Sequence, residues 1–163
     1  MIQKDLIEAF EFLEREYNFK ILNKENDSNQ YYKIVYSNMK IGIQIEYEIR
    51  QGILSIIIYK CVNGQIIKNP LSLKNCLTSD LYGVPLWVIE KIKGLEPIGP
   101  AYKIFSTEEI LNDKDINKKL FSLYKNRLLN CCTDLLNEDI RIFDFYVIEY
   151  KSFLKKLIDG KNY

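Results

Sequence analysis

The strand-like segment that begins at Ile41 constrains the fold of this chain more than any other feature. Between positions 41 and 49 every second residue is isoleucine or tyrosine, and the residues between them are small or polar: Gly42, Gln44, Glu46 and Glu48. Because side chains alternate between the two faces of a strand, this period of two predicts a β-strand with one buried face and one wet face. A sheet with the same asymmetry is therefore expected.

Turn-forming residues follow this strand at regular intervals. Arg50-Gln51-Gly52 is expected to reverse the chain into a second, more apolar strand at 53–59. Asn63-Gly64, a pair that tolerates the positive φ angles of a type I′ turn, is expected to reverse it again into a short strand at 65–68. The segment 39–69 thus predicts an antiparallel meander.

A helix and two more strands are expected ahead of the meander. Apolar residues recur at spacings of three and four over residues 2–17, the pattern of an amphipathic helix. Residues 19–22 are predicted as a short strand, the polar run 23–29 as a loop, and the β-forming run 31–36 as a strand. This order needs no crossover, so we expect about five antiparallel strands.

The second half of the sequence favours helices. Residues 70–105 are irregular, with a short helix predicted at 86–93 that has Pro85 in its first turn. Ser106 and Glu109 have the spacing of a capping box. Apolar residues at every fourth position from Ile116 to Leu136 predict a long helix. A last helix is expected between Asp144 as its cap and Gly160 at its end. The prediction is a single α+β domain over residues 1–163: an N-terminal helix, an antiparallel meander sheet of about five strands, and C-terminal helices.

The sequence contains no histidine, and this removes most familiar catalytic designs. A Ser-His-Asp triad, a Cys-His dyad and histidine-based metal sites are excluded. Acid–base chemistry would need carboxylates, lysines, tyrosines or cysteines with shifted pKa values. We therefore expect a protein that is not an enzyme and that uses neither cofactor nor metal.

Charge and composition also narrow the partners. The formal net charge of +1 provides no global field for nucleic acid or an anionic membrane. The N-terminus lacks the layout of a secretory signal and no apolar run is long enough to span a membrane, which predicts a cytoplasmic protein. The four cysteines include the neighbours Cys131 and Cys132 but no CxxC pair, so reduced, partly buried thiols are expected.

Two features are candidates for partner binding. Gln44, Glu46 and Glu48 project from the same face of their strand, where they could meet a basic partner, hold a divalent metal, or simply form the wet face of the sheet. Trp87 and Tyr102 lie on the irregular segment 83–105, whose aromatic residues could form a recognition surface or cap a small core.

Two segments resemble parts of a family of small bacterial cytoplasmic α+β proteins. In the first, Phe10-Glu11-Phe12-Leu13 through Tyr17-Asn18-Phe19, a helix ending in Tyr-x-Phe leads into an antiparallel sheet. In the second, residues 135–143 (LLNEDIRIF), one C-terminal helix is followed by the next. The resemblance spans most of the chain except 70–105. Such proteins occur as immunity-like members of toxin loci, which implies a protein-binding role and defines no catalytic residue.

These features together predict a non-catalytic protein-binding module, an immunity-like or adaptor protein that recognises another protein. Two alternatives remain open. One is a metal-dependent hydrolase with Glu46 and Glu48 as ligands. The other is a homo-oligomeric structural protein that self-associates through a sheet edge or through the tyrosine-rich strand 31–36.

Overall fold

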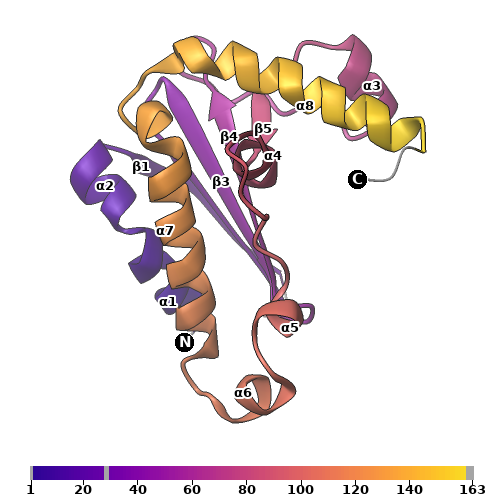
Figure 1. Cartoon of the computed structure of the whole chain (residues 1–163). Coiled ribbons are helices and arrows are strands. Elements are labelled where there is room, and N and C mark those ends of the chain that lie inside the picture. The colour runs from indigo at the N-terminus through magenta and orange to yellow at the C-terminus, as the bar shows by residue number, and fades with distance from the viewer. Residues whose placement is uncertain (1, 28–29, 161–163) are drawn as a thin grey trace.

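The chain folds into an antiparallel sheet with helices packed on one of its faces. The computed structural model describes residues 2–27 and 30–160. Its N-terminal half consists of two helices and four strands: α1 (Ile2–Phe10), α2 (Phe12–Tyr17), β1 (Lys20–Asp27), β2 (Tyr31–Ser37), β3 (Ile41–Glu48) and β4 (Ile53–Lys60). Its C-terminal half is mostly helical: α3 (Leu73–Thr78), β5 (Gly83–Pro85), α4 (Leu86–Ile92), α5 (Ala101–Ile104), α6 (Thr107–Asn112), α7 (Ile116–Leu136), the 3-10 helix η1 (Ile140–Ile142) and α8 (Phe143–Ile158) (Figure 1).

The sheet has five antiparallel strands in the order β1-β2-β3-β4-β5, which confirms the predicted α+β class and meander. The prediction of a strand at 65–68 was wrong. Asn63 and Gly64 have the positive φ angles expected of the turn, 51° and 77°, but the turn closes only an isolated bridge between Val62 and Gln65. The chain then leaves the plane of the sheet, and the edge of β4 pairs instead with β5, about twenty residues further along the chain.

The first strand is longer than the sequence predicted. Residues 23–27, expected to be a loop, continue β1 and pair with β2 as far as Asp27 opposite Tyr31. The polar composition is compatible with a strand because β1 is at the edge of the sheet and residues 22–27 are exposed on both faces. The remaining two residues of the predicted loop, Ser28 and Asn29, lie outside the described residues.

The core lies between the sheet and the helices α1, α2 and α7 (Figure 1). The alternating apolar residues of β3 supply its centre, since Ile43 and Ile45 are fully buried. Tyr47 meets Phe121 of α7 edge to face, with ring centroids 4.9 Å apart, and its hydroxyl donates to Asn117 Oδ1 at 2.6 Å. The long helix predicted from apolar residues at every fourth position is thus α7. These apolar residues form the face that α7 buries against the sheet.

The predicted N-terminal helix is interrupted at Glu11, giving α1 and α2. In one continuous helix Phe10 and Leu13 would share a face while Phe12 pointed away from it. The interruption allows all three side chains to be buried, and Phe12 is only 5% exposed. The burial of a third large apolar side chain accounts for the break.

The helix ends match the sequence in two cases and differ in a third. Ser106 and Glu109 form the predicted capping box at α6, and Gly160 has a positive φ of 67° just after α8. Asp144, predicted as a cap, instead lies in the first turn of α8, which begins one residue earlier. Helices α3 and α5 were not predicted. None of the described helices is both long enough and apolar enough to cross a bilayer.

Candidate functional site

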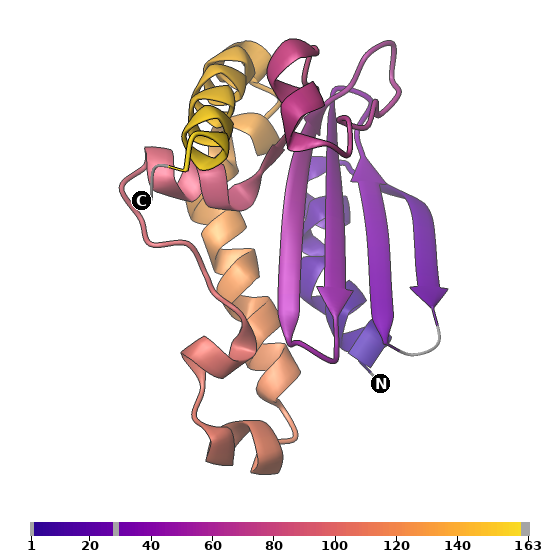
Figure 2. The same ribbon diagram turned by 90° about the vertical axis from the view of Figure 1, so that its right-hand side faces the viewer.

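The face of the sheet opposite the helices is a candidate interaction surface, and we call it the open face. No described helix covers its middle, which is turned toward the viewer in Figure 2. Alternation along three neighbouring strands brings to this face a set of polar, charged and small apolar side chains: Tyr31, Lys33, Val35, Gln44, Glu46, Glu48 and Ser55. The three strand residues predicted for partner binding therefore lie together, as their spacing required.

Gln44 and Glu46 interact with each other on this face. Gln44 Nε2 donates to Glu46 Oε1 at 2.6 Å, and the Tyr31 hydroxyl also hydrogen-bonds to Glu46. Burial and this carboxylate raise the pKa of Tyr31 above its usual value. Gln44 is only 6% exposed, and its Oε1 has no hydrogen-bond partner among the described residues. Gln44 is thus buried, whereas the sequence predicted an exposed residue on the wet face.

Charges alternate across the strands beside this pair. Lys33 is the cross-strand neighbour of Glu46 on β2, and its Nζ donates to both carboxylate oxygens of Glu25 on β1 at 3.0 Å. Glu48, further along β3, accepts a hydrogen bond from Gln51 Nε2 at 2.8 Å. Glu25 and Lys33 were not predicted from the sequence. Lys33 is two residues from Tyr31 on the same strand, so the two side chains lie on the same face.

The end of the open face nearest the β4–α3 connection is covered by that connection. The side chain of Ile66 packs over Gly42, where a Cβ atom would lie 2.4 Å from Cδ1 of Ile66 and would force that side chain to move. Lys68 places its Nζ 4.7 Å from the ring centroid of Tyr59, and burial is the main cause that lowers the pKa of Lys68. Burial likewise raises the pKa of Tyr59 to about 12. The accessible part of the face is therefore the part around Glu46 and Glu48.

Trp87 and Tyr102 do not join the open face. Trp87, on α4, packs edge to face against Tyr150 of α8 with ring centroids 6.1 Å apart. Tyr102, on α5, is 63% exposed and lies beside the β3–β4 turn, where the neighbouring Ala101 N–H donates to the carbonyl of Gly52 at 2.9 Å. The five residues predicted for partner binding therefore fall in three separate places.

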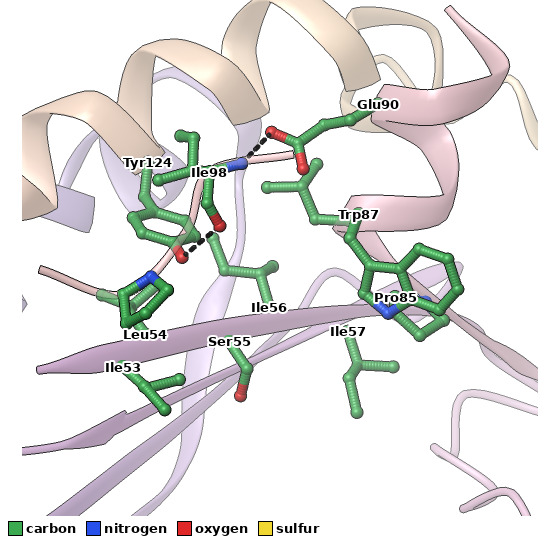
Figure 3. A pocket seen from close by; sticks show the side chains of 12 residues that line it. Ile53, Leu54, Ser55, Ile56, Ile57, Pro85, Trp87, Glu90, Ile98 and Tyr124 are labelled. Atoms are coloured by element: carbon green, nitrogen blue, oxygen red, sulfur yellow. Dashed lines mark hydrogen bonds between the residues drawn. The ribbon is translucent and has the colours of Figure 1, made fainter. Parts of the chain in front are cut away.

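Trp87 borders a second candidate site, a cavity of about 360 Å³ beside β4 that we call the edge pocket. Residues 53–57 of β4 form one wall, α4 forms another with Trp87 and Glu90, and Ile98 and Tyr124 close the side toward α7 (Figure 3). The Tyr124 hydroxyl donates to the carbonyl of Ile98 at 3.2 Å. The irregular segment 83–105 was expected either to form a recognition surface or to cap a small core. In the structure it forms a wall of a pocket.

Glu90 is the charged group of the edge pocket, and the sequence reasoning did not select it. It is 2% exposed, and its Oε1 lies 3.2 Å from Nη1 of Arg127 and accepts a hydrogen bond from the Ile98 N–H at 3.4 Å. Burial raises the pKa of Glu90, while Arg127 opposes the rise. The signal in the sequence was a lone glutamate inside the apolar run Leu86–Ile92.

The cysteines and carboxylates are candidates for redox chemistry and metal binding. All four cysteines are free thiols, and burial raises the pKa of Cys131 and of Cys132. High thiol pKa values keep these groups protonated and poorly nucleophilic. Within residues 2–27 and 30–160, no three or more Asp, Glu or Cys side chains gather in a way that could hold a metal ion.

The strand 31–36, considered above as a surface for self-association, is internal. As β2 it pairs with β1 on one side and with β3 on the other, so its backbone is not at a sheet edge. Among the described strands, the unpaired edges are those of β1, of β5 and of the part of β4 that β5 does not cover.

Comparison with known proteins adds no relative to this description. No family model, no curated protein and no solved structure matches the chain. The class defined by the fold is an α+β protein with a five-stranded meander, one face of which carries helices.

Proposed function

We propose that this chain is a non-catalytic protein-binding module that recognises a basic surface of another protein through its open face. The observation that carries the proposal is the position of Glu46 and Glu48. They lie two residues apart on the central strand, on a face that no described helix covers in its middle. Carboxylates on an uncovered face can supply electrostatic complementarity to a basic partner.

The hydrogen bonds of the open face hold its carboxylates in place. Gln44 and Tyr31 orient Glu46, and Gln51 orients Glu48. Charges fixed in this way lose little side-chain entropy when a partner binds, and they steer a basic partner during approach. The immunity-like or adaptor role implied by the family resemblance is one form of this function, because such proteins act by occupying a surface of another protein.

Charge reversal on the open face is the experiment that tests the proposal. Tagged wild-type protein is used to capture partners from lysate of the source organism, and the association rate of a recovered partner is then measured with purified components. In the variant Glu46→Lys/Glu48→Lys we expect association at least about tenfold slower at low salt, with a weaker dependence on ionic strength.

A matched control variant makes the same change in net charge at a position outside the open face. Glu14 and Glu16 are exposed on α2, behind the sheet, so Glu14→Lys/Glu16→Lys changes the net charge by the same amount away from the open face. This control should bind at the wild-type rate. Equal slowing in both variants, or no slowing in either, would contradict the role of the open face. A concentration-dependent increase in mass by light scattering without a partner would favour the homo-oligomer instead.

A further inference from the structure

Tyr102 lies outside both the open face and the edge pocket, and it borders a further cavity that we call the end pocket. This cavity of about 500 Å³ lies at the end of the sheet where β3 turns into β4. Three more segments complete its wall: α5 with Tyr102, α6 with Ile110, and the first turn of α7 with Ile116. The Ala101 N–H holds α5 against the turn by donating to the Gly52 carbonyl at 2.9 Å. Figure 1 shows α5, α6 and the start of α7 grouped at this end of the sheet.

The end pocket is accessible from solvent, in contrast to the edge pocket. On its rim, Tyr102 is 63% exposed, Ile110 is 36% exposed, and Arg50 is exposed as well. Glu90 and Tyr124, which line the edge pocket, are buried. Large apolar side chains that remain exposed around a hollow are a feature of binding sites. A ligand can therefore reach this cavity from outside.

The walls of the end pocket are mostly apolar. Isoleucines from the turn, α6 and α7 line it together with two tyrosines: Ile49, Ile110, Ile116, Tyr47 and Tyr102. The Tyr47 hydroxyl donates to Asn117 Oδ1 at 2.6 Å, and the Nδ2 group of Asn117 remains a donor without a partner among the described residues. An apolar cavity of this size with a few polar groups has the character of a small-ligand site, for which volumes of about 300–1,000 Å³ are typical.

Arg50 is the single charged residue among those that line the end pocket. Its guanidinium makes no ion pair or hydrogen bond with any of the described residues. Asp113 and Asp115, which precede α7, are each paired with a lysine of that helix. A guanidinium can bind a carboxylate through two parallel hydrogen bonds. The unpaired cation beside an apolar wall therefore fits a ligand that is both anionic and apolar.

We propose that the end pocket binds a carboxylate carried on an apolar group. Arg50 binds the carboxylate, and the isoleucine and tyrosine side chains enclose the apolar part. Two sources supply this chemistry: a free short-chain acid, and the C-terminal residue of a peptide when its side chain is apolar. The end pocket is separate from the open face, and its test needs no protein partner, so this proposal does not depend on the function proposed for that face.

NMR titration with matched acids and amides tests the proposal. Amide proton–nitrogen spectra of the protein are recorded with isocaproate and with the peptide acetyl-Gly-Gly-Leu, and then with the neutral amide of each. We expect saturable shifts at the Gly52 and Ala101 amides and at the Arg50 side chain, with a dissociation constant of about 1 mM for the better acid. Each amide should bind at least about tenfold more weakly, because it loses the charge-assisted hydrogen bonds. The acid that binds more tightly identifies the source of the ligand.

Substitution of Arg50 tests the role of the cation. Arg50→Gln should weaken binding of both acids at least about tenfold and leave the weak binding of the amides unchanged. Arg50→Lys keeps the charge without the planar pair of donors, so it should bind the acids with intermediate affinity. The matched control Arg141→Gln removes the same charge from an exposed side chain of η1, at the other end of α7, and should bind like wild type.

A substitution on the rim tests the position of the site. Ile110→Glu places a second carboxylate beside the cavity and should abolish binding of the acids by like-charge repulsion. The matched control Ile148→Glu makes the same change at an exposed isoleucine of α8 and should have no effect.

Four results would overturn the proposal. They are the absence of saturable shifts up to about 50 mM acid in protein whose spectrum shows it folded, shifts confined to residues outside the end pocket, equal affinity for acid and amide, and unchanged acid binding in Arg50→Gln.

Discussion

The two faces of the sheet are made by the same strands and yet have opposite physical characters. On β3, Ile43 and Ile45 are fully buried under α7 and its neighbours, whereas Glu46 and Glu48, which follow them along the strand, are partly exposed on the open face. Each face nevertheless buries a polar side chain that contradicts its character. The covered side buries the charge of Glu90, and the open face buries the amide of Gln44.

This difference shows where stability and recognition are separated in the molecule. Apolar burial on the covered face supplies the free energy of folding, because each buried isoleucine contributes roughly 1.5–3 kcal/mol. Exposed charges on the open face contribute little to folding, since surface ion pairs are worth about 0–1 kcal/mol. The open face is therefore free to carry side chains chosen for binding, while the two exceptions mark places where folding and another requirement compete.

The largest expected effect comes from truncating the covered face. Ile45→Ala removes a fully buried side chain between Ile34 and Ile56 and leaves a cavity, so we expect a loss of about 2–5 kcal/mol in the free energy of unfolding. Glu48→Ala, on the other face, should change it by less than about 1 kcal/mol, because its hydrogen-bond partner Gln51 is exposed. Urea denaturation of both variants checks this contrast, and similar losses in the two would remove the distinction between the faces.

A smaller, pH-dependent effect is expected from Glu90. Its pKa is raised in the folded protein by burial, so the charged form destabilises the fold at neutral pH relative to an exposed glutamate. This cost falls as the pH drops through the folded-state pKa, and it is lost near the unfolded value of about 4.3. Wild type should therefore gain stability relative to Glu90→Gln between pH 7 and pH 4.5.

Urea denaturation of wild type and Glu90→Gln at the two pH values measures this gain, because effects of acid on other groups cancel in the difference. A constant difference between the two proteins would mean that burial does not perturb Glu90. A difference that moves in the other direction would mean that the contact with Arg127 outweighs the desolvation of the carboxylate.

The smallest expected effect is on the open face at Gln44. Its unpaired Oε1 carries a desolvation cost of about 1–3 kcal/mol, while its bond to Glu46 contributes about 1 kcal/mol. Gln44→Leu removes both, so we expect stability within about 1 kcal/mol of wild type, on the stabilising side. Thermal unfolding measures this directly. A clear loss of stability would show that the amide is satisfied in solution, for instance by an ordered water.

Local patterns predicted much of the fold because their cause lies within a few residues. The capping box of Ser106 and Glu109 and the strand alternation of 41–49 need no distant partner, and both were confirmed. Failures came where a distant segment decided the outcome. The turn at Asn63-Gly64 had the expected geometry, yet the strand beside β4 came from residues 83–85.

The candidate site divides in the same way. The spacing of Gln44, Glu46 and Glu48 placed them on one face, but only the fold showed that Gln44 is buried there and that Lys33 and Glu25 lie beside it. The only local signal of the edge pocket was the glutamate within Leu86–Ile92, because the walls of the pocket come from β4, α4, the segment before α5, and α7.

The sequence by itself determined the period of each strand, the class of the fold and the absence of histidine chemistry, since composition and periodicity act residue by residue. Only the tertiary structure decided which face of the sheet is uncovered, where the pairing between β4 and β5 ends, and which carboxylate is buried. These outcomes depend on which distant segments compete for the same edge or face, and that competition is settled by packing across the whole core.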